Sequence, residues 1–449
     1  MMCRKRTGLS AISAVKLIAC VAVICLPVLG ETTEDCGSRD APKAASTNRP
    51  MRAKQSPVLT VGQTGGDLRG SDDKVIQAGV DYLHGLGGGT LRIQPGVYEL
   101  RNAIHLRPHI TLIGSGEQTI LRKAPSVVTA LSRDSDWYEY GVEVNDPTGF
   151  VPGCGILLRS STGPGEWQFD VLRATVTAVD GRVLFLDRLT HENFWLQKNA
   201  TAATIFPILT AEDVDDVRIE DLVLDGNRPH NEKINGNFGG AVFIQGCNHW
   251  RFRNVTARNY NGDGFSLQVC DDVQFESCKA VNNADLGFHP GSGSQRPVFR
   301  NCTSTGNSQG IFFCWAVSDG LAEGCTLSDN SLYGISIGHR DTDNIVRNCT
   351  IEQNGEVGIL LRDEGGEFRG GHRNRIENCT IRDNGGQQPG IGVDIRGITH
   401  DITVLDTRLD STAGGSQKIG IRIGKQAGQV SLQGNTYAGC STAVEDLRQ

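Results

Sequence analysis

A repeat of roughly two dozen residues runs through the second half of this 449-residue chain. Cysteines recur at steps of 24, 23, 24 and 30 residues, an asparagine follows each of them, and glycines recur at steps of 23 or 24. A fixed period of this length indicates a stacked-repeat architecture. The three series are Cys278, Cys302, Cys325, Cys349, Cys379; Asn283, Asn307, Asn330, Asn354, Asn384; and Gly264, Gly287, Gly310, Gly334, Gly358.

Each repeat consists of short strands joined by tight turns. After the glycine comes an alternating run such as Gly-Phe-Ser-Leu-Gln at 264–268, and a second short run such as Val298–Arg300 precedes the cysteine. Alternation with β-branched residues predicts strands, and no unit has room for a helix. We therefore predict a parallel β-helix in which equivalent residues stack about 4.8 Å apart. The asparagines should form a ladder along one turn, and the cysteines should be buried free thiols.

The first 30 residues indicate export. A basic start (Arg4, Lys5, Arg6) precedes an apolar stretch from Leu17 to Leu29, which is typical of a secretory signal peptide. Two alternatives are a transmembrane anchor and a bacterial lipoprotein box ending at Cys20. Removing the four basic residues of this segment takes the net charge from −7 to −11, which disfavours nucleic acid and anionic membranes as partners. No other segment is long and apolar enough for a membrane span. We expect a protein that is secreted, periplasmic or on the cell surface.

The remaining chain divides into four parts. Residues 31–56 are polar and predict a disordered linker. In residues 57–126 we expect an N-terminal cap and the first coils, with a helix from Asp72 to Leu86, capped by Ser71, that covers the open end of the apolar column. Residues 127–208 break the period and contain Trp137 and Trp167, which predicts an inserted β-rich lobe. Residues 209–449 form the regular coils.

Several motifs in the cap resemble the pectate-lyase-like right-handed parallel β-helix superfamily. They are Gly-Gly-Thr-Leu at 88–91, Pro-Gly-Val-Tyr at 95–98 and Leu-Ile-Gly-Ser-Gly at 112–116. The resemblance implies an all-β, right-handed parallel β-helix. It says little about activity, because that superfamily includes lyases, hydrolases, epimerases, phage tailspikes and adhesins.

One row of side chains departs from an ordinary solvated surface. The first and third residues after each marker glycine are apolar and should point inward, so the second and fourth should point outward with the following turn. Aromatic rings in such a row could stack on sugars, and arginine could bind carboxylate or sulfate. The alternative is that these side chains only stabilise turns between coils. The row comprises Ser266, Gln268, His289, Ser292, Phe312, Cys314, Trp315, Ser336, His339, Arg340, Asp341, Arg362, Asp363, Glu364, Asp394, Arg396, Arg422 and Lys425.

Two catalytic mechanisms and one non-catalytic role fit this row. In β-elimination or C5-epimerisation of an acidic polysaccharide, His289 or His339 would be the base and Arg340 and Arg362 would neutralise the uronate. His289-Pro290-Gly291 resembles a His/Asp-Pro pattern of superfamily epimerases. Trp315, Arg362, Asp363 and Arg396 would bind the substrate.

The second mechanism is hydrolysis by paired carboxylates. Asn-Gly-Asp-Gly at 261–264 resembles the first acidic motif of polygalacturonases, which makes Asp263 and Asp285 candidates. Tyr333 and Leu286 depart from that family's pattern. The third possibility is a carbohydrate-binding or structural protein without catalysis. The sequence leaves all three open, and it leaves the oligomeric state open as well.

We expect no cofactor. Calcium is the one ion that the sequence brings into consideration, because Asp271, Asp272, Asp341 and Asp343 offer oxygen ligands at turns. Such pairs more often cap turns. No cysteine and histidine cluster has the spacing of a zinc site.

Overall fold

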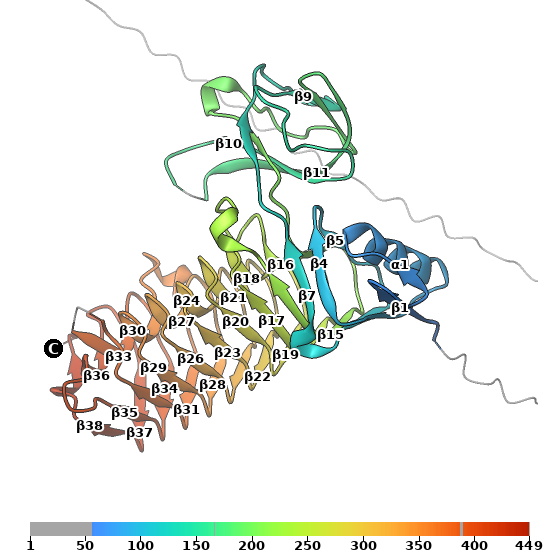
Figure 1. Cartoon of the computed structure of the whole chain (residues 1–449). Helices are drawn as coiled ribbons and strands as arrows, with labels where there is room; N and C mark the ends of the chain where they lie inside the picture. The colour runs from blue at the N-terminus through green and yellow to red at the C-terminus, as the bar shows by residue number, and fades with distance from the viewer. Residues whose placement is uncertain (1–55, 166, 387–388, 449) are drawn as a thin grey trace, which may run out of the picture. The chain divides into compact units, whose positions relative to one another are not determined.

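The computed structural model describes residues 56–165, 167–386 and 389–448 (Figure 1). The predicted signal segment, and the predicted linker up to residue 55, lie outside the described residues. The fold is all-β with two long parallel sheets, as the repeat predicted. Among the described residues, no helix is long and apolar enough to cross a membrane.

The first parallel sheet has 11 strands and carries the candidate site. Each strand is hydrogen-bonded to the next, and Figure 1 shows most of them stacked one coil after another. In spatial order the strands are β5 (Ile104–His105), β14 (Leu209–Glu212), β16 (Gly240–Gln245), β18 (Asp263–Gln268), β21 (Leu286–Pro290), β24 (Gln309–Phe312), β27 (Tyr333–Ile337), β30 (Val357–Leu361), β33 (Gly390–Ile395), β36 (Gln417–Ile423) and β39 (Thr442–Asp446).

The second parallel sheet has 22 strands. Each regular coil contributes two short strands to it and one strand to the first sheet. The strands are β1 (Val58–Gly62), β2 (Leu68–Arg69), β3 (Gly89–Ile93), β4 (Gly96–Leu100), β6 (Ile110–Ile113), β7 (Thr119–Lys123), β15 (Arg218–Asp225), β17 (Arg251–Arg258), β19 (Gln274–Glu276), β20 (Lys279–Val281), β22 (Val298–Arg300), β23 (Thr303–Thr305), β25 (Leu321–Glu323), β26 (Thr326–Ser328), β28 (Ile345–Arg347), β29 (Thr350–Glu352), β31 (Arg375–Glu377), β32 (Thr380–Arg382), β34 (Ile402–Leu405), β35 (Arg408–Asp410), β37 (Val430–Gln433) and β38 (Thr436–Ala438).

The predicted register is confirmed. Phe265 pairs with Phe288, and the column continues with Ile311, Ile335 and Ile359, all of them fully buried. Phenylalanine rings within this column stack face to face, and those of the opposite sheet stack on one another in the same way. The Phe265 and Phe288 rings lie 5.0 Å apart and 2° from parallel. Parallel stacking in register therefore places residues about two dozen positions apart directly above one another.

The asparagine ladder is also present. Asn283 Nδ2 donates to Asn307 Oδ1 at 3.0 Å, and Asn330 Nδ2 donates to Asn354 Oδ1 at 2.9 Å. From Asn307 to Asn384, each asparagine side chain also accepts from the backbone N–H of the preceding asparagine, as Asn330 does from Asn307 N at 3.1 Å. The five cysteines of the repeat are buried and unpaired, as predicted, and their thiols contact backbone carbonyls.

A single α-helix, α1 (Asp73–Gly85), packs on the first coils in the described part of the chain. Its buried side chains Ile76, Val80 and Leu83 belong to the same core as the strands. The N-cap is Asp72 and not the predicted Ser71, because the Asp72 carboxylate accepts from Val75 N at 3.2 Å.

The inserted β-rich lobe is a separate antiparallel sheet with its own core. Cys154, whose place the sequence did not indicate, is buried in that core. The sheet order is β8 (Val128–Ala130), β13 (Thr201–Ala203), β10 (Gly155–Ser161), β11 (Phe169–Asp180), β12 (Val183–Leu186) and β9 (Gly141–Glu143). Four short 3-10 helices complete the described structure: η1 (Gly116–Gln118), η2 (Leu196–Lys198), η3 (Arg228–His230) and η4 (Glu367–Arg369).

Candidate functional site

A cavity of about 520 Å³ lies where the 11-stranded sheet meets two covering segments. Strands β21 and β24 and the turns after them form one side. The covering segments are the loop at 235–237 and the lobe residue Trp167, which is more than half exposed. The lining residues are Trp167, Asn235, Gly236, Asn237, Gln268, Asp285, Leu286, His289, Ser292, Gln309, Phe312, Cys314 and Trp315.

A buried acid–histidine pair lies in the wall of this cavity. His289 Nδ1 is 2.7 Å from Asp263 Oδ2, and the two side chains are 3% and 0% exposed. Asp263 Oδ1 also accepts the backbone N–H of Leu286 at 3.0 Å, which fixes the carboxylate. Asp263 and His289 come from consecutive strands, β18 and β21, so only the stacking of two coils brings them together.

The charge of Asp263 determines the state of the imidazole. Burial lowers the pKa of His289, but the hydrogen bond and the negative charge of Asp263, with a smaller contribution from Cys314, outweigh it and raise the pKa to about 10. At neutral pH His289 is then an imidazolium. Its second nitrogen, Nε2, is buried and makes no hydrogen bond of good geometry with any described residue. The Phe312 ring meets the imidazole edge to face, with centroids 5.5 Å apart.

Trp315 connects this cavity to the second predicted histidine. The indole lines the cavity, is 51% exposed and stacks on the His339 ring with a centroid separation of 4.2 Å. His339 is 8% exposed, and its Nδ1 lies 3.5 Å from Glu364 Oε2. His339 therefore supports the tryptophan from behind and is not itself among the residues that line the cavity.

Arg362 is held within a network of internal bonds. Its guanidinium donates to Glu364 at 2.7 Å, to Ser336 Oγ at 2.8 Å and to the Phe313 carbonyl at 3.0 Å. It also lies 4.4 Å from the centre of the Phe312 ring. These contacts use most of the donors that a substrate carboxylate would need, so Arg362 positions Phe312 more directly than it could bind a sugar.

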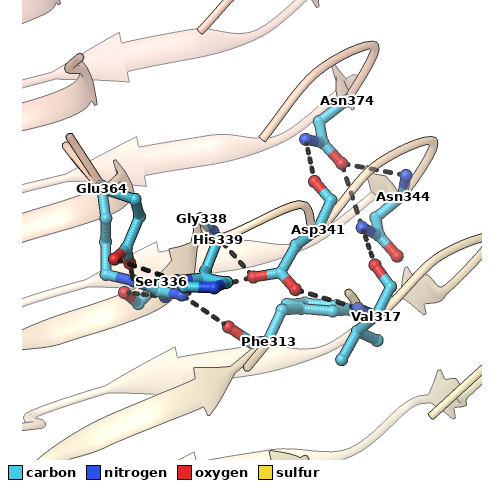
Figure 2. Close-up of polar contacts among 10 residues, drawn as sticks. Phe313, Val317, Ser336, Gly338, His339, Asp341, Asn344, Glu364 and Asn374 are labelled. Carbon is cyan, nitrogen blue, oxygen red and sulfur yellow. Dashed lines mark hydrogen bonds and ion pairs between the residues drawn. The ribbon is translucent and has the colours of Figure 1, made fainter. Parts of the chain in front are cut away.

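Asp341 is a further member of the network around Arg362. It is fully buried, accepts from Gly338 N at 2.8 Å and Val317 N at 3.0 Å, and lies 3.3 Å from Arg362 (Figure 2). Burial raises the pKa of Asp341 to about 7, although Arg362 and the two backbone bonds act in the opposite direction. This aspartate fixes a turn and does not reach the cavity.

The other predicted residues are more widely spread. Asp285 lines the cavity. Arg340 is exposed on the turn after β27 with φ 69°, and Asp363 is exposed and accepts from Gly365 N at 3.1 Å. Arg396 lies one coil beyond Arg362 and pairs with the buried Asp394 at 2.7 Å. Arg340, Asp363 and Arg396 are not among the residues that line the cavity.

The outward row differs from the prediction in its exposure. Ser266, Ser336 and Asp394 are fully buried, although we expected them to face solvent. The carbonyl of Gly236 covers Ser266, and the long arginine side chains cover the other two. A row of outward positions thus becomes partly buried when loops and long side chains lie over it.

The turn aspartates considered for calcium are paired with arginine. Arg296 bonds Asp271 at 3.0 Å and Asp272 at 2.8 Å, and Arg373 bonds Asp343 at 2.7 Å. Among the described residues, no group of three or more His, Cys, Asp or Glu side chains could hold a metal ion.

Trp167, Asn235, Asn237 and Cys314 are among the cavity residues that the sequence-based choice of site residues missed. Trp167, Asn235 and Asn237 come from the lobe and from an interruption between coils, where the repeat gives no register. Cys314 did stand in the outward row. Its signal was that it lies outside the internal cysteine series, in a strand position otherwise used by Gln268 and Arg362.

Comparisons with known proteins agree on the fold. Residues 240–368 match the family model described as right handed beta helix region. No curated protein sequence matches the chain. Two similar solved structures are the mannuronan C-5 epimerase AlgE4 and AlgE6 A-modules of Azotobacter vinelandii. The AlgE4 module is 16% identical with a TM-score of 0.54, covering 86% of this chain and 97% of its own. The AlgE6 module is 18% identical with a TM-score of 0.51, covering 83% and 91%.

A third similar structure is PfbA, a surface adhesin of Streptococcus pneumoniae. It is 11% identical with a TM-score of 0.50, covering 86% of this chain and 93% of its own. Enzymes and an adhesin therefore share this fold, and identities this low establish the fold alone. The repeat, the two parallel sheets and these matches together identify the chain as a right-handed parallel β-helix protein.

Proposed function

We propose that this protein is an exported enzyme that acts on an extended acidic polysaccharide. The reaction begins with loss of the proton beside a uronate carboxylate and ends in β-elimination or C5-epimerisation. The observation that carries the proposal is the buried Asp263–His289 pair in the wall of a cavity flanked by two exposed tryptophans. Perturbed ionisable pairs in clefts occur preferentially at functional sites.

The pair suits the charge that this reaction develops. Removing the C5 proton places negative charge on the carboxylate of the sugar, and a fixed imidazolium would stabilise it with little reorganisation. Asp263 supplies that imidazolium by holding His289 protonated at neutral pH. His289 is therefore suited to neutralise the uronate carboxylate, which is the role that the sequence analysis gave to Arg340 and Arg362. Another group of the cavity must then take the C5 proton.

Aromatic side chains would hold the sugar rings. Trp167 and Trp315 are 62% and 51% exposed and line the same cavity. Exposed indoles that line a cavity suit the apolar faces of pyranose rings. Support of Trp315 by His339 would make it a rigid platform.

Hydrolysis by two carboxylates has less support. Of the described residues that line the cavity, Asp285 is the one carboxylate. Asp263 is fully buried and bonded to His289 and to a backbone N–H, so it has no path to a glycosidic oxygen or to water.

A panel of uronans and sulfated glycans tests the proposal. The protein without its predicted signal segment is incubated with each polymer; absorbance of unsaturated uronate reports elimination, and deuterium incorporation at C5 in D₂O reports epimerisation. New reducing ends without either signal would favour hydrolysis instead. Binding without turnover across the panel would favour a non-catalytic carbohydrate-binding protein and would overturn the proposal that the protein is an enzyme.

Matched variants connect any activity to the site. His289→Gln should abolish turnover, because a neutral amide cannot supply the charge. Asp271→Asn removes the charge of an exposed carboxylate that pairs with Arg296, and it should leave turnover unchanged. Full activity of His289→Gln would exclude this pair from the mechanism.

A further inference from the structure

One residue that lines the cavity is a cysteine whose thiol differs in its contacts from those of the cysteine ladder. Cys314 follows β24, is 8% exposed and lines the cavity together with His289. The cysteines of the internal ladder direct their Sγ atoms to backbone carbonyls, as Cys302 does to Phe275 O at 3.6 Å. Among the described residues, Cys314 Sγ has no such bond. A bond to the backbone therefore does not explain a cysteine at this position.

Cys314 shares the cavity with the histidine of the buried acid–histidine pair. Asp263 binds His289 through Nδ1, which leaves Nε2 as the imidazole atom available to a third group. Nε2 is buried without a well-formed hydrogen bond, and Cys314 is the nearby ionisable group whose interaction contributes to the raised pKa of His289. Acid, imidazole and thiol in this order is the arrangement that activates cysteines, because an adjacent imidazolium favours the thiolate.

The two residues after Cys314 have left-handed backbone conformations, as the equivalent residues His339 and Arg340 of the next coil do. Trp315 and Ala316 have φ values of 57° and 65°, which place two successive non-glycine residues in the left-handed region. Backbone N–H groups of this turn bond the neighbouring coils, as Cys314 N does to Pro290 O at 3.1 Å. This turn places both the thiol and the indole among the residues that line the cavity.

We propose that Cys314 is a catalytic residue of this cavity: its thiolate, paired with the His289 imidazolium, takes the C5 proton of a bound uronate. This inference rests on the proposed function and identifies its missing base. Sγ gains the proton as the C5–H bond breaks, and the electron pair is delocalised into the uronate carboxylate beside His289. In elimination that pair then forms the C4–C5 double bond while O4 leaves with its bonding electrons and takes a proton from water. In epimerisation a proton from water returns to the opposite face of C5.

Alkylation tests the ion pair without any substrate. The rate of iodoacetamide labelling at Cys314 is followed by peptide mass spectrometry between pH 5 and 9, and Cys440, a free and partly exposed cysteine, serves as the control for the shape of the pH profile. Cys314 should label at a nearly constant rate from about pH 6 to 8, whereas an ordinary thiol of pKa about 8.5 gains roughly tenfold per unit. His289→Gln should slow labelling of Cys314 at pH 6 by about 100-fold. An ordinary thiol profile in the wild type would overturn the proposal.

Turnover tests the role of the thiolate as a base. On the polymer that the wild type converts, Cys314→Ser should lower kcat at least about 100-fold with KM nearly unchanged, since a hydroxyl is a far weaker base at neutral pH. Cys314→Ala serves as a second variant, and circular dichroism verifies folding of both. Wild-type kcat in Cys314→Ser, or loss of turnover in Asp285→Asn alone, would overturn the proposal. A thiolate profile without turnover by the wild type would instead overturn the proposed function.

Discussion

Asp263→Asn gives the most direct quantitative test of the buried pair. The wild-type pKa of His289 is raised to about 10 from an ordinary 6.5, so folding is linked to protonation of this ring. The stabilisation is fully present below pH 6.5 and is lost as the pH rises through 10. The pKa difference corresponds to about 5 kcal/mol at low pH, about 4 kcal/mol at pH 7 and about 1 kcal/mol at pH 9.

The variant should reverse this dependence. Without the carboxylate charge, burial, the largest effect on the imidazole, is opposed only by the smaller contribution of Cys314 and lowers the pKa of His289 below 6.5, so stability should fall as the pH drops. The loss in unfolding free energy relative to wild type should therefore be about 3–5 kcal/mol at pH 6–7 and should shrink toward pH 9. Asparagine can still accept the Leu286 N–H, so the loss reports mainly the charge.

Urea unfolding at pH 6, 7, 8 and 9 measures the effect. Asp271→Asn is the matched control because its ion pair with Arg296 is exposed, and it should change stability by no more than about 0.5 kcal/mol at any pH. A loss in Asp263→Asn that is the same at pH 6 and pH 9 would refute a charged His289. So would a loss no larger than that of the control.

Three further predictions concern other parts of the molecule. Asn330→Ala should cost about 2–4 kcal/mol in urea unfolding, because it leaves the buried Asn307 N–H without its acceptor and removes one of the two donors to the Asn354 amide oxygen; a loss below about 1 kcal/mol would show that the ladder adds little. Burial lowers the pKa of Lys123 to about 7, below its unfolded value, so stability should rise with pH between 7 and 10. Lys123→Met should remove that component of the pH slope, and an unchanged slope would contradict it. Trp315→Ala should weaken binding of uronate oligomers about tenfold in calorimetry with little loss of stability, because the indole is half exposed; unchanged affinity would exclude it as a sugar platform.

The regular coils could be predicted almost completely. Each repeat must satisfy the same local requirements, which are an apolar pair in the core, a glycine where the backbones of adjacent coils come close, and an asparagine that bonds its copies. At Gly264 a Cβ would lie 2.7 Å from the Gly287 carbonyl oxygen, so no other residue fits. Such requirements recur in the sequence with the period of the coil, and the period alone gives the register.

The site could be predicted only in part. Stacking placed Asp263 and His289 in adjacent coils, but the sequence does not show that the carboxylate reaches the imidazole or that the pair is buried. Arg362 looked like a free cation in the row, yet the structure directs it to Ser336 and Glu364. A side chain's partners depend on rotamers and neighbours that no periodicity encodes.

The sequence by itself therefore determined the parallel β-helix, its register and the residues that share one face, because those follow from a local pattern repeated at a fixed step. Only the tertiary structure decided which of these residues form a site. The lobe and the loop at 235–237 interrupt the repeat, and they close a cavity over His289 and Cys314. Both side chains of the acid–histidine pair are buried, so the charge of Asp263 acts on the imidazole with little screening and holds it protonated.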